Sequence, residues 1–80
     1  MTKIEYGKCE KMMEEAIQKA KQAQEEYKEA SRYLNVENRI ACRIEQSKAD
    51  QHIGYANGIN QVLATLNFQH CRMKELSELL

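Results

Sequence analysis

The stretch that decides the fold is residues 6–34, which read YGKCEKMMEEAIQKAKQAQEEYKEASRYL. Within it, apolar and small side chains recur at alternating steps of three and four residues, which places them on one face of a helix. This predicted seam consists of Tyr6, Cys9, Met13, Ala16, Ala20, Ala23, Tyr27, Ala30 and Leu34. The other positions are almost all Glu, Lys and Gln, so we expect the opposite face to be solvated. The average step of about 3.5 residues is typical of a coiled coil, and the alanines predict a close contact with another helix.

Signals at both ends bound this first helix at about residues 2–34. Thr2 followed by Glu5 has the spacing of a capping box. The seam ends at Leu34, and Asn35 suits either a helix end or a helix start, so a turn is predicted near residue 35. Ser47 with Asp50 gives a second capping-box spacing, which leaves open an alternative with a longer first helix and a turn near residue 46.

The rest of the chain predicts a second helix over about residues 36–66 and a short third helix over about residues 69–80, after a possible cap at Asn67. The second helix carries one apolar stripe and then, after a shift, another. These are Val36, Ile40 and Ile44, followed by Ala49, Ile53, Ala56, Ile59, Leu63 and Leu66. A chain that folds back at Asn35 places Gly54 opposite Ala16. Each glycine in a helix interior costs about 1 kcal/mol relative to alanine, so Gly54 and Gly58 are expected at a close helix contact, with the first arm or with a second copy.

These elements predict one all-α domain over residues 1–80, a long antiparallel helical hairpin with a short C-terminal helix and coiled-coil-like packing. A chain of 80 residues buries only about 60% of the surface that its unfolded form exposes. The three cysteines, Cys9, Cys42 and Cys71, cannot all pair within one chain and match no disulfide framework. We therefore expect a reducing, cytoplasmic setting, and a homo-oligomer that completes the thin core.

Composition and spacing argue against several classes of function. The 12 basic and 12 acidic residues are interspersed, so we do not expect nucleic acid as a partner, since that binding depends on clustered positive charge. No stretch is apolar enough for a membrane span, and no signal peptide is expected. The cysteines and the histidines His52 and His70 lack the spacing of a metal-chelating loop. No nucleotide-binding or catalytic motif is present, so we expect no metal, no cofactor and no enzymatic activity.

One arrangement favours an anionic ligand. Arg39 and Arg43 are four residues apart, on one face of the second helix. Two guanidinium groups placed in this way can grip a phosphate or a carboxylate. Tyr55, between the two glycines, is the third candidate contact in this predicted site.

The segment GYANGINQVL, residues 54–63, resembles the closing helix of short helical accessory proteins of bacteriophages and mobile elements. The resemblance covers about ten residues and implies a cytosolic protein that acts by binding, for example on a host protein. Some phage anti-defence proteins are oligomeric helical hairpins that sequester cyclic nucleotides, although no residue motif here matches one of those families. The leading hypothesis is a non-enzymatic protein–protein interaction module, and the alternative is an oligomer that sequesters an anionic cyclic nucleotide.

Overall fold

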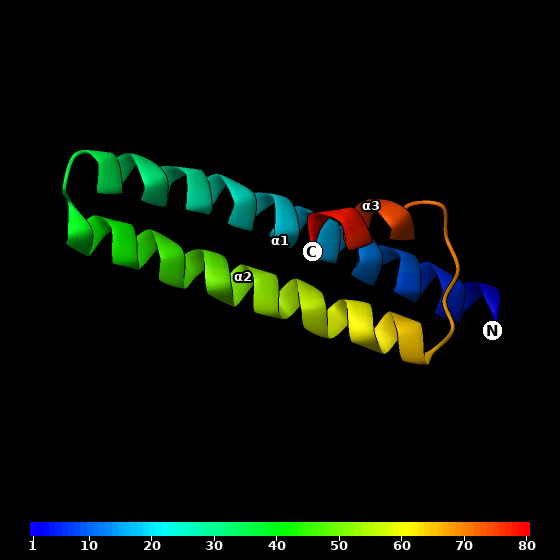
Figure 1. The fold of residues 1–80 in the computed structure, drawn as a ribbon. Coiled ribbons are helices and arrows are strands. Elements are labelled where there is room, and N and C mark those ends of the chain that lie inside the picture. The colour runs from blue at the N-terminus through cyan, green and yellow to red at the C-terminus, as the bar shows by residue number, and fades with distance from the viewer.

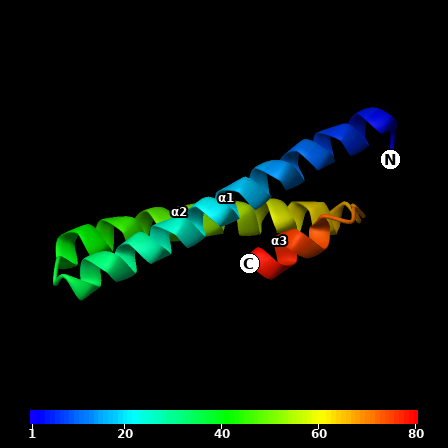
Figure 2. The same cartoon turned by 90° about the horizontal axis from the view of Figure 1, so that it is seen from above.

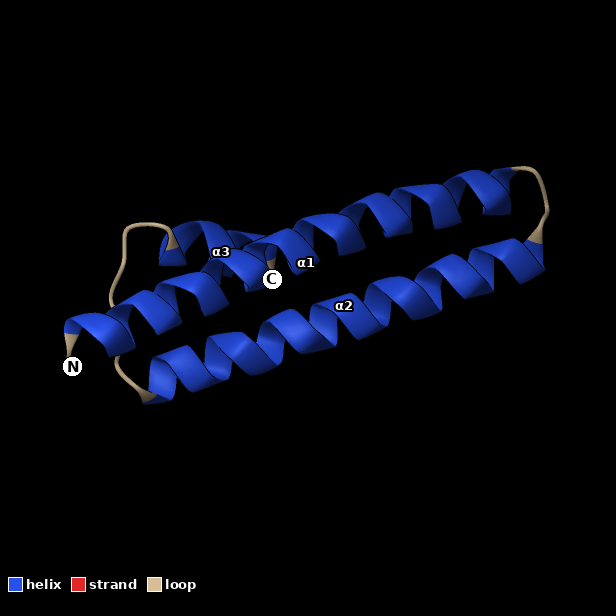
Figure 3. Cartoon of the chain, turned by 180° about the vertical axis from the view of Figure 1, so that it is seen from behind, coloured by secondary structure: helices blue, strands red, loops and turns tan.

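The computed structural model describes all 80 residues, Met1–Leu80, and consists of helices and their connections. Helix α1 spans Lys3–Asn35, α2 spans Arg39–Thr65 and α3 spans Met73–Leu79. The first two run antiparallel as a long hairpin, and α3 lies beside the N-terminal half of α1 (Figure 1). Figure 3 shows the same hairpin from behind, with loops only at the turn, before α3 and at the chain ends. The predicted all-α hairpin is confirmed, and none of its helices has the length and apolarity needed to cross a membrane.

The first helix begins at the predicted cap. The Thr2 hydroxyl oxygen accepts a hydrogen bond from the backbone N–H of Glu5 at 3.1 Å and donates to the Glu5 carboxylate at 3.2 Å. One of the four backbone donors that a helix start leaves without an intrahelical partner is thereby satisfied.

The hairpin turn is a three-residue connection, Val36 to Asn38, directly after the predicted position. The N–H of Asn38 donates to the carbonyl of Tyr33 at 2.8 Å and the N–H of Glu37 to that of Leu34 at 3.0 Å, which is the Schellman pattern of a helix end. Asn38 then caps α2 by accepting from the N–H of Ala41 at 3.1 Å. The alternative turn near residue 46 is not observed, because α2 is continuous through that point.

A second Schellman pattern ends α2. The N–H of Phe68 donates to the carbonyl of Leu63, and the N–H of Asn67 to that of Ala64, both at 3.0 Å. Asn67 takes a φ of 56°, the left-handed conformation that this position requires. Asn67 therefore closes the second helix. The sequence had suggested that it caps the third helix, and this prediction is wrong. The motif turns Phe68 back into the core beside Leu63.

The core is thick at one end of the hairpin and thin at the other. At the open end, α1, α2, the loop and α3 bury a single cluster of side chains. Its members are Cys9, Met13, Ala16, Ile17, Ala20, Ala56, Ile59, Leu63, Phe68 and Leu76. Toward the turn only two helices meet, and the buried residues there are Ala23, Ala30, Cys42 and Ala49. Seen from above, α3 covers one side of the hairpin at the open end, whereas the turn end has two helices alone (Figure 2).

The structure corrects several predicted contacts at the turn end. The stripe of Val36, Ile40 and Ile44 is 72%, 77% and 51% exposed. Because α2 is one continuous helix, a single rotation about its axis fixes which residues face α1. The face that carries Ala49 and Ala56 is turned toward α1. The isoleucines then lie on the opposite face. Leu34, the last predicted seam residue, is 58% exposed, since the helices separate into the turn at this point.

The glycines also lie elsewhere than the sequence suggested. Gly54 and Gly58 are exposed, and a Cβ atom added to either would meet nothing within 4 Å. The connection takes up residues 36–38, so the pairing shifts, and neither glycine lies in the contact with α1. Their packing against a second copy stays a prediction. Tyr6 and Tyr27 flank the seam, 40% and 38% exposed, and the other six seam residues of α1 are buried.

The turn offers a test of the helix end. Glu37 has a φ of 60°, a conformation in which a Cβ atom is strained and glycine is not. We expect Glu37→Gly to raise the free energy of unfolding by about 1 kcal/mol and the melting temperature by roughly 4–8 °C. The change in melting temperature is measured by thermal unfolding, with circular dichroism as the signal. Glu37→Ala is the control, because it removes the charge but keeps the Cβ atom, and an equal gain in both variants would contradict the assignment.

Candidate functional site

The two predicted arginines share a hollow at the turn end of the hairpin. Its volume is about 330 Å³, and it is lined by Leu34, Arg39, Cys42, Arg43 and Gln46. The nearby cations Arg32 and Lys48 each pair with a glutamate three residues earlier. Neither guanidinium of the hollow makes such a pair within the chain, so both remain free to bind an anion.

Tyr55 does not join this hollow. It lies twelve residues along α2 from Arg43, a separation of about 18 Å in a helix. Its hydroxyl donates to the Glu15 carboxylate at 2.7 Å, and the Lys19 ammonium lies 5.9 Å from the centre of its ring. The bond to Glu15 raises the pKa of Tyr55 above its ordinary value. Within one chain, the three predicted ligand contacts are thus not brought together.

Two further polar contacts join the two arms of the hairpin near its middle. The Tyr27 hydroxyl donates to the Asp50 carboxylate at 2.5 Å, and the His52 ring nitrogen Nδ1 lies 2.5 Å from a Glu26 carboxylate oxygen. The hydrogen bond to Asp50 raises the pKa of Tyr27. Since these pairs join residues far apart in sequence, they help to fix the register of α1 against α2.

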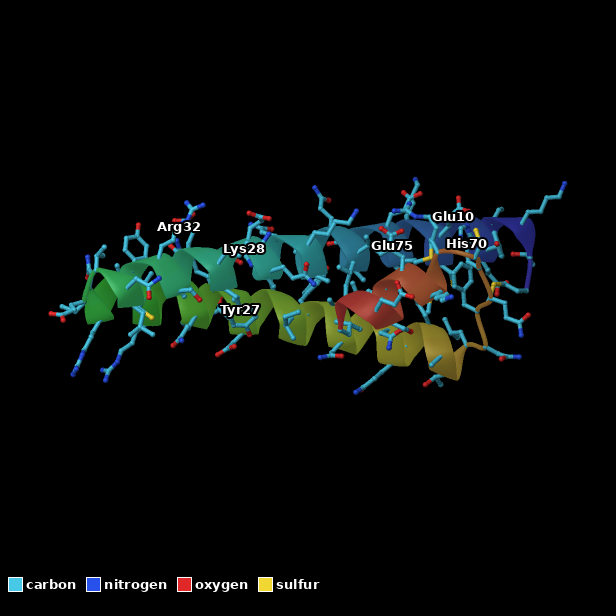
Figure 4. The ribbon with its side chains drawn as sticks, turned by 45° about the horizontal axis from the view of Figure 1, so that its top comes forward. Glu10, Tyr27, Lys28, Arg32, His70 and Glu75 are labelled. Atoms are coloured by element: carbon cyan, nitrogen blue, oxygen red, sulfur yellow. The ribbon has the colours of Figure 1, made fainter.

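Charged residues dock the third helix on the first. Glu75 pairs with Lys21 of α1 at 3.1 Å and with Arg72 at 3.2 Å. These two cations, Lys21 first, lower the pKa of Glu75. Figure 4 shows Glu75 on the flank of α1, with Glu10 and His70 farther toward its N-terminus. Leu76, next to Glu75, is fully buried, so the ion pairs surround an apolar anchor.

An aromatic cluster lies before α3. The rings of Tyr6 and Phe68 have centroids 5.1 Å apart, and His70 stacks on Phe68 at 5.9 Å. The Tyr6 hydroxyl donates to the carbonyl of Gln69 at 3.4 Å. Together these contacts hold the loop against the start of α1.

The same loop places the exposed thiol of Cys71 beside the ring of His70. The contact of His70 with Glu10 was not predicted from the sequence. The Sγ atom of Cys71 lies 3.7 Å from Nδ1 of His70, and Nε2 of His70 lies 3.0 Å from the Glu10 carboxylate. The N–H of Arg72 donates to Nδ1 at 3.0 Å, which assigns the proton of the neutral ring to Nε2. The lone pair that a catalytic base would offer to the thiol is therefore already engaged. Only the adjacency of His70 and Cys71 signals this site in the sequence, because Glu10 comes from a distant segment.

Large apolar side chains form a further feature of the surface. Twelve of them are exposed, a number close to the 14 residues that the whole chain buries. They lie at the open end, at the turn and along α2. The exposed members are Met1, Ile4, Tyr6, Tyr27, Leu34, Val36, Ile40, Ile44, Tyr55, Val62, Leu66 and Leu80.

The three thiols differ in accessibility, which gives a test of the packing. Cys9 and Cys42 are buried, and Cys71 is exposed. Because a thiol must be accessible to react, we expect one thiol per native chain to react rapidly with a disulfide reagent such as DTNB, and all three to react in denaturant. The Cys71→Ser variant should lose the rapid phase. A rapid phase of two or three thiols in the native protein would contradict the burial of Cys9 and Cys42.

The segment that carries the resemblance to mobile-element proteins, residues 54–63, lies in the C-terminal half of α2. Its apolar residues Ala56, Ile59 and Leu63 belong to the core, whereas Gly54 and Gly58 face outward. No family model, curated protein or solved structure matches the chain.

Proposed function

We propose that the chain is a non-enzymatic protein–protein interaction module that acts as a homo-oligomer. The observation that carries this proposal is the set of twelve large apolar side chains on the surface. Monomeric proteins expose single apolar residues freely, but contiguous exposed apolar surface marks interaction sites. Here Ile40 and Ile44 lie next to Leu34 and Val36 at the turn, and all four side chains are exposed.

The thin turn half of the hairpin supports the same proposal. The residues that it buries, Ala23, Ala30, Cys42 and Ala49, are small, and hydrophobic stabilisation scales with the apolar area that leaves water. A small domain with so little core gains stability when another chain covers its remaining apolar surface. A second copy of the same protein can cover this surface, because it is present wherever the first copy is.

A host protein is the proposed target of the assembled module, in the cytoplasm. The resemblance of residues 54–63 to mobile-element accessory proteins supports this part of the proposal. The three free thiols suit a reducing compartment.

Self-association is the property to measure first. We expect light scattering at micromolar concentration to give a discrete mass that is a multiple of the 9.3 kDa chain. Because apolar contacts are not screened by salt, the assembly should persist in 1 M sodium chloride. A folded monomer across the concentration series would contradict the proposal, and loss of the assembly in salt would contradict its apolar basis.

A second candidate function is the binding of an anionic nucleotide. The observation that favours it is the hollow of about 330 Å³ that both Arg39 and Arg43 line. Guanidinium groups bind phosphate oxygens with paired, charge-assisted hydrogen bonds. The adjoining Leu34 side chain provides an apolar wall against which a base can pack.

A thermal-shift series with cyclic mono- and dinucleotides tests this candidate. A ligand at 100 times its dissociation constant adds about 2.7 kcal/mol to the free energy of unfolding, so a binder should raise the melting temperature by several degrees. The Arg39→Ala, Arg43→Ala double variant should lose that shift. Arg32→Ala is the matched control, since Arg32 lies outside the hollow, and an equal loss there or no shift with any nucleotide would remove the candidate.

A further inference from the structure

The third helix is too short to persist without its contact to the hairpin. Helix α3 has seven residues, and an isolated helix of fewer than about 12 residues is only marginally stable in water. No side chain caps its start, and no basic residue in its last turn compensates the helix dipole. The helical form of α3 therefore depends on its docking against the hairpin.

Docking of α3 covers a side of α1 that lies off the seam. Ile17 is 2% exposed, although it lies about 100° around the helix from the seam residue that precedes it. Glu14 and Lys21 share this side, three residues before Ile17 and four after it. Glu14 lies 3.9 Å from the Arg72 guanidinium, and the Lys21 ammonium lies 3.1 Å from the Glu75 carboxylate. Ile17 is thus buried beneath α3, on the flank of α1 where Figure 4 shows Glu75.

One side chain anchors α3. Leu76 is its only buried residue, with no exposed surface, and belongs to the same core cluster as Ile17. Met73 and Leu79, three residues to either side, pack against this cluster and are partly buried. The ion pairs around them are exposed, and exposed pairs contribute little to stability. Docking of α3 therefore depends mainly on Leu76.

The loop before α3 has contacts of its own with the hairpin. Phe68 is buried in the core, and Nε2 of His70 lies 3.0 Å from the Glu10 carboxylate. Neither contact involves α3, so residues 68–70 can stay in place when α3 leaves. Release of α3 then requires rotation only at residues 71–72, which form a turn.

We propose that α3 is a releasable cover and that the site beneath it binds an amphipathic helix of a partner protein. The inference rests on the proposed interaction function and names the surface and the chemistry of the partner. Helix α3 itself shows what the site accepts, namely apolar side chains three residues apart and an acidic side chain that reaches Lys21. The partner helix carries the same pattern, because it must cover Ile17 and place a negative charge near Lys21.

A helix that is already folded has an advantage over α3 at this site. Docking of α3 also has to order its backbone, which is unfavourable, whereas a preformed helix does not bear this cost. The connection of α3 to the hairpin acts in the opposite direction, since it keeps α3 at a high local concentration. A partner helix at sufficient concentration therefore displaces α3 and covers the apolar side of α1 in its place.

Thiol reactivity of the full chain tests the release. In a Cys71→Ser background, which removes the exposed thiol, the Ile17→Cys chain carries a thiol beneath α3. Its modification by N-ethylmaleimide is followed by mass spectrometry in increasing urea. We expect the rate at residue 17 to rise only slightly with urea below the unfolding transition, because release of α3 exposes little surface. A rate that follows global unfolding, measured by circular dichroism, would overturn the inference.

Two further measurements support the thiol experiment. Leu76→Ala, added to the Ile17→Cys chain, should raise the rate at residue 17 about tenfold or more, since it removes most of the anchor. Glu78→Gln is the matched control, because Glu78 is exposed on the same helix, and it should leave the rate unchanged. In the chain without substitutions, amide hydrogen exchange of residues 73–80 should show the same weak dependence on urea. An equal effect of both substitutions, or exchange only through global unfolding, would overturn the inference.

A labelled peptide with the sequence of residues 72–80, RMKELSELL, tests the site. We expect it to bind the Leu76→Ala chain at least about tenfold more tightly than the parent chain, whose site is occupied by α3. The peptide with Leu76→Ala is the matched control and should not bind. The peptide with Glu75→Lys should bind more weakly, because its charge repels Lys21. Equal binding to both chains, equal binding of the Glu75→Lys peptide, or no binding at about 1 mM peptide would overturn the inference.

Light scattering of the same chains separates this inference from the proposed function. A self-associated chain whose α3 opens only on global unfolding would overturn the inference and leave self-association standing. A monomer that releases α3 and binds the peptide would overturn the homo-oligomer and leave the site standing. A parent dimer that Leu76→Ala converts to a monomer would show that α3 of a second copy occupies the site, and would overturn the inference.

Discussion

The contact between small side chains on α1 and α2 is the constraint on which the rest of the structure depends. Ala16, Ala20 and Ala23 on the first helix, and Ala49 and Ala56 on the second, have no exposed surface at all. Methyl groups allow two helices to approach toward the lower end of the usual range of about 8–10 Å between axes. A straight, continuous helix has a single rotation about its axis, so this contact decides for every other residue whether it faces the partner or the solvent.

That constraint explains why the hairpin needs α3 at one end. Where the alanine contact gives way to Met13, Ile17, Ile59 and Leu63, two helices leave one side of these larger residues open. Phe68 and α3 cover that side, and the Asn67 turn directs the chain back to do so. The Glu75 ion pairs with Lys21 and Arg72 surround the buried Leu76. They add orientation more than stability, because exposed ion pairs contribute little.

The sequence predicted α1 and the hairpin well, because the period of its seam is unbroken and the intervening residues are polar. The rotation of α2 could not be predicted in the same way. That helix has two apolar stripes, and hydrophobicity alone favours burying Ile40 and Ile44 over Ala49 and Ala56. The rotation of α2 is set by how closely its surface fits the small residues of the α1 seam. That fit depends on the shapes of both helix surfaces. Contacts such as Glu10 with His70 were also beyond reach, since they join residues from opposite ends of the chain.

The contact of the alanine face of α2 with α1 determines which apolar residues remain exposed. A solitary hairpin would bury more apolar area with α2 rotated so that its isoleucines met α1, but their bulk would hold the helices apart along their whole length. With the small residues inward, the larger apolar residues remain on the outside, together with two glycines that no intrachain contact requires. Helix α2 therefore packs on the first arm through its small residues and keeps large apolar residues such as Ile40 and Ile44 exposed. The thin core and the exposed apolar residues have the same cause, which is that the small residues of α2 face α1.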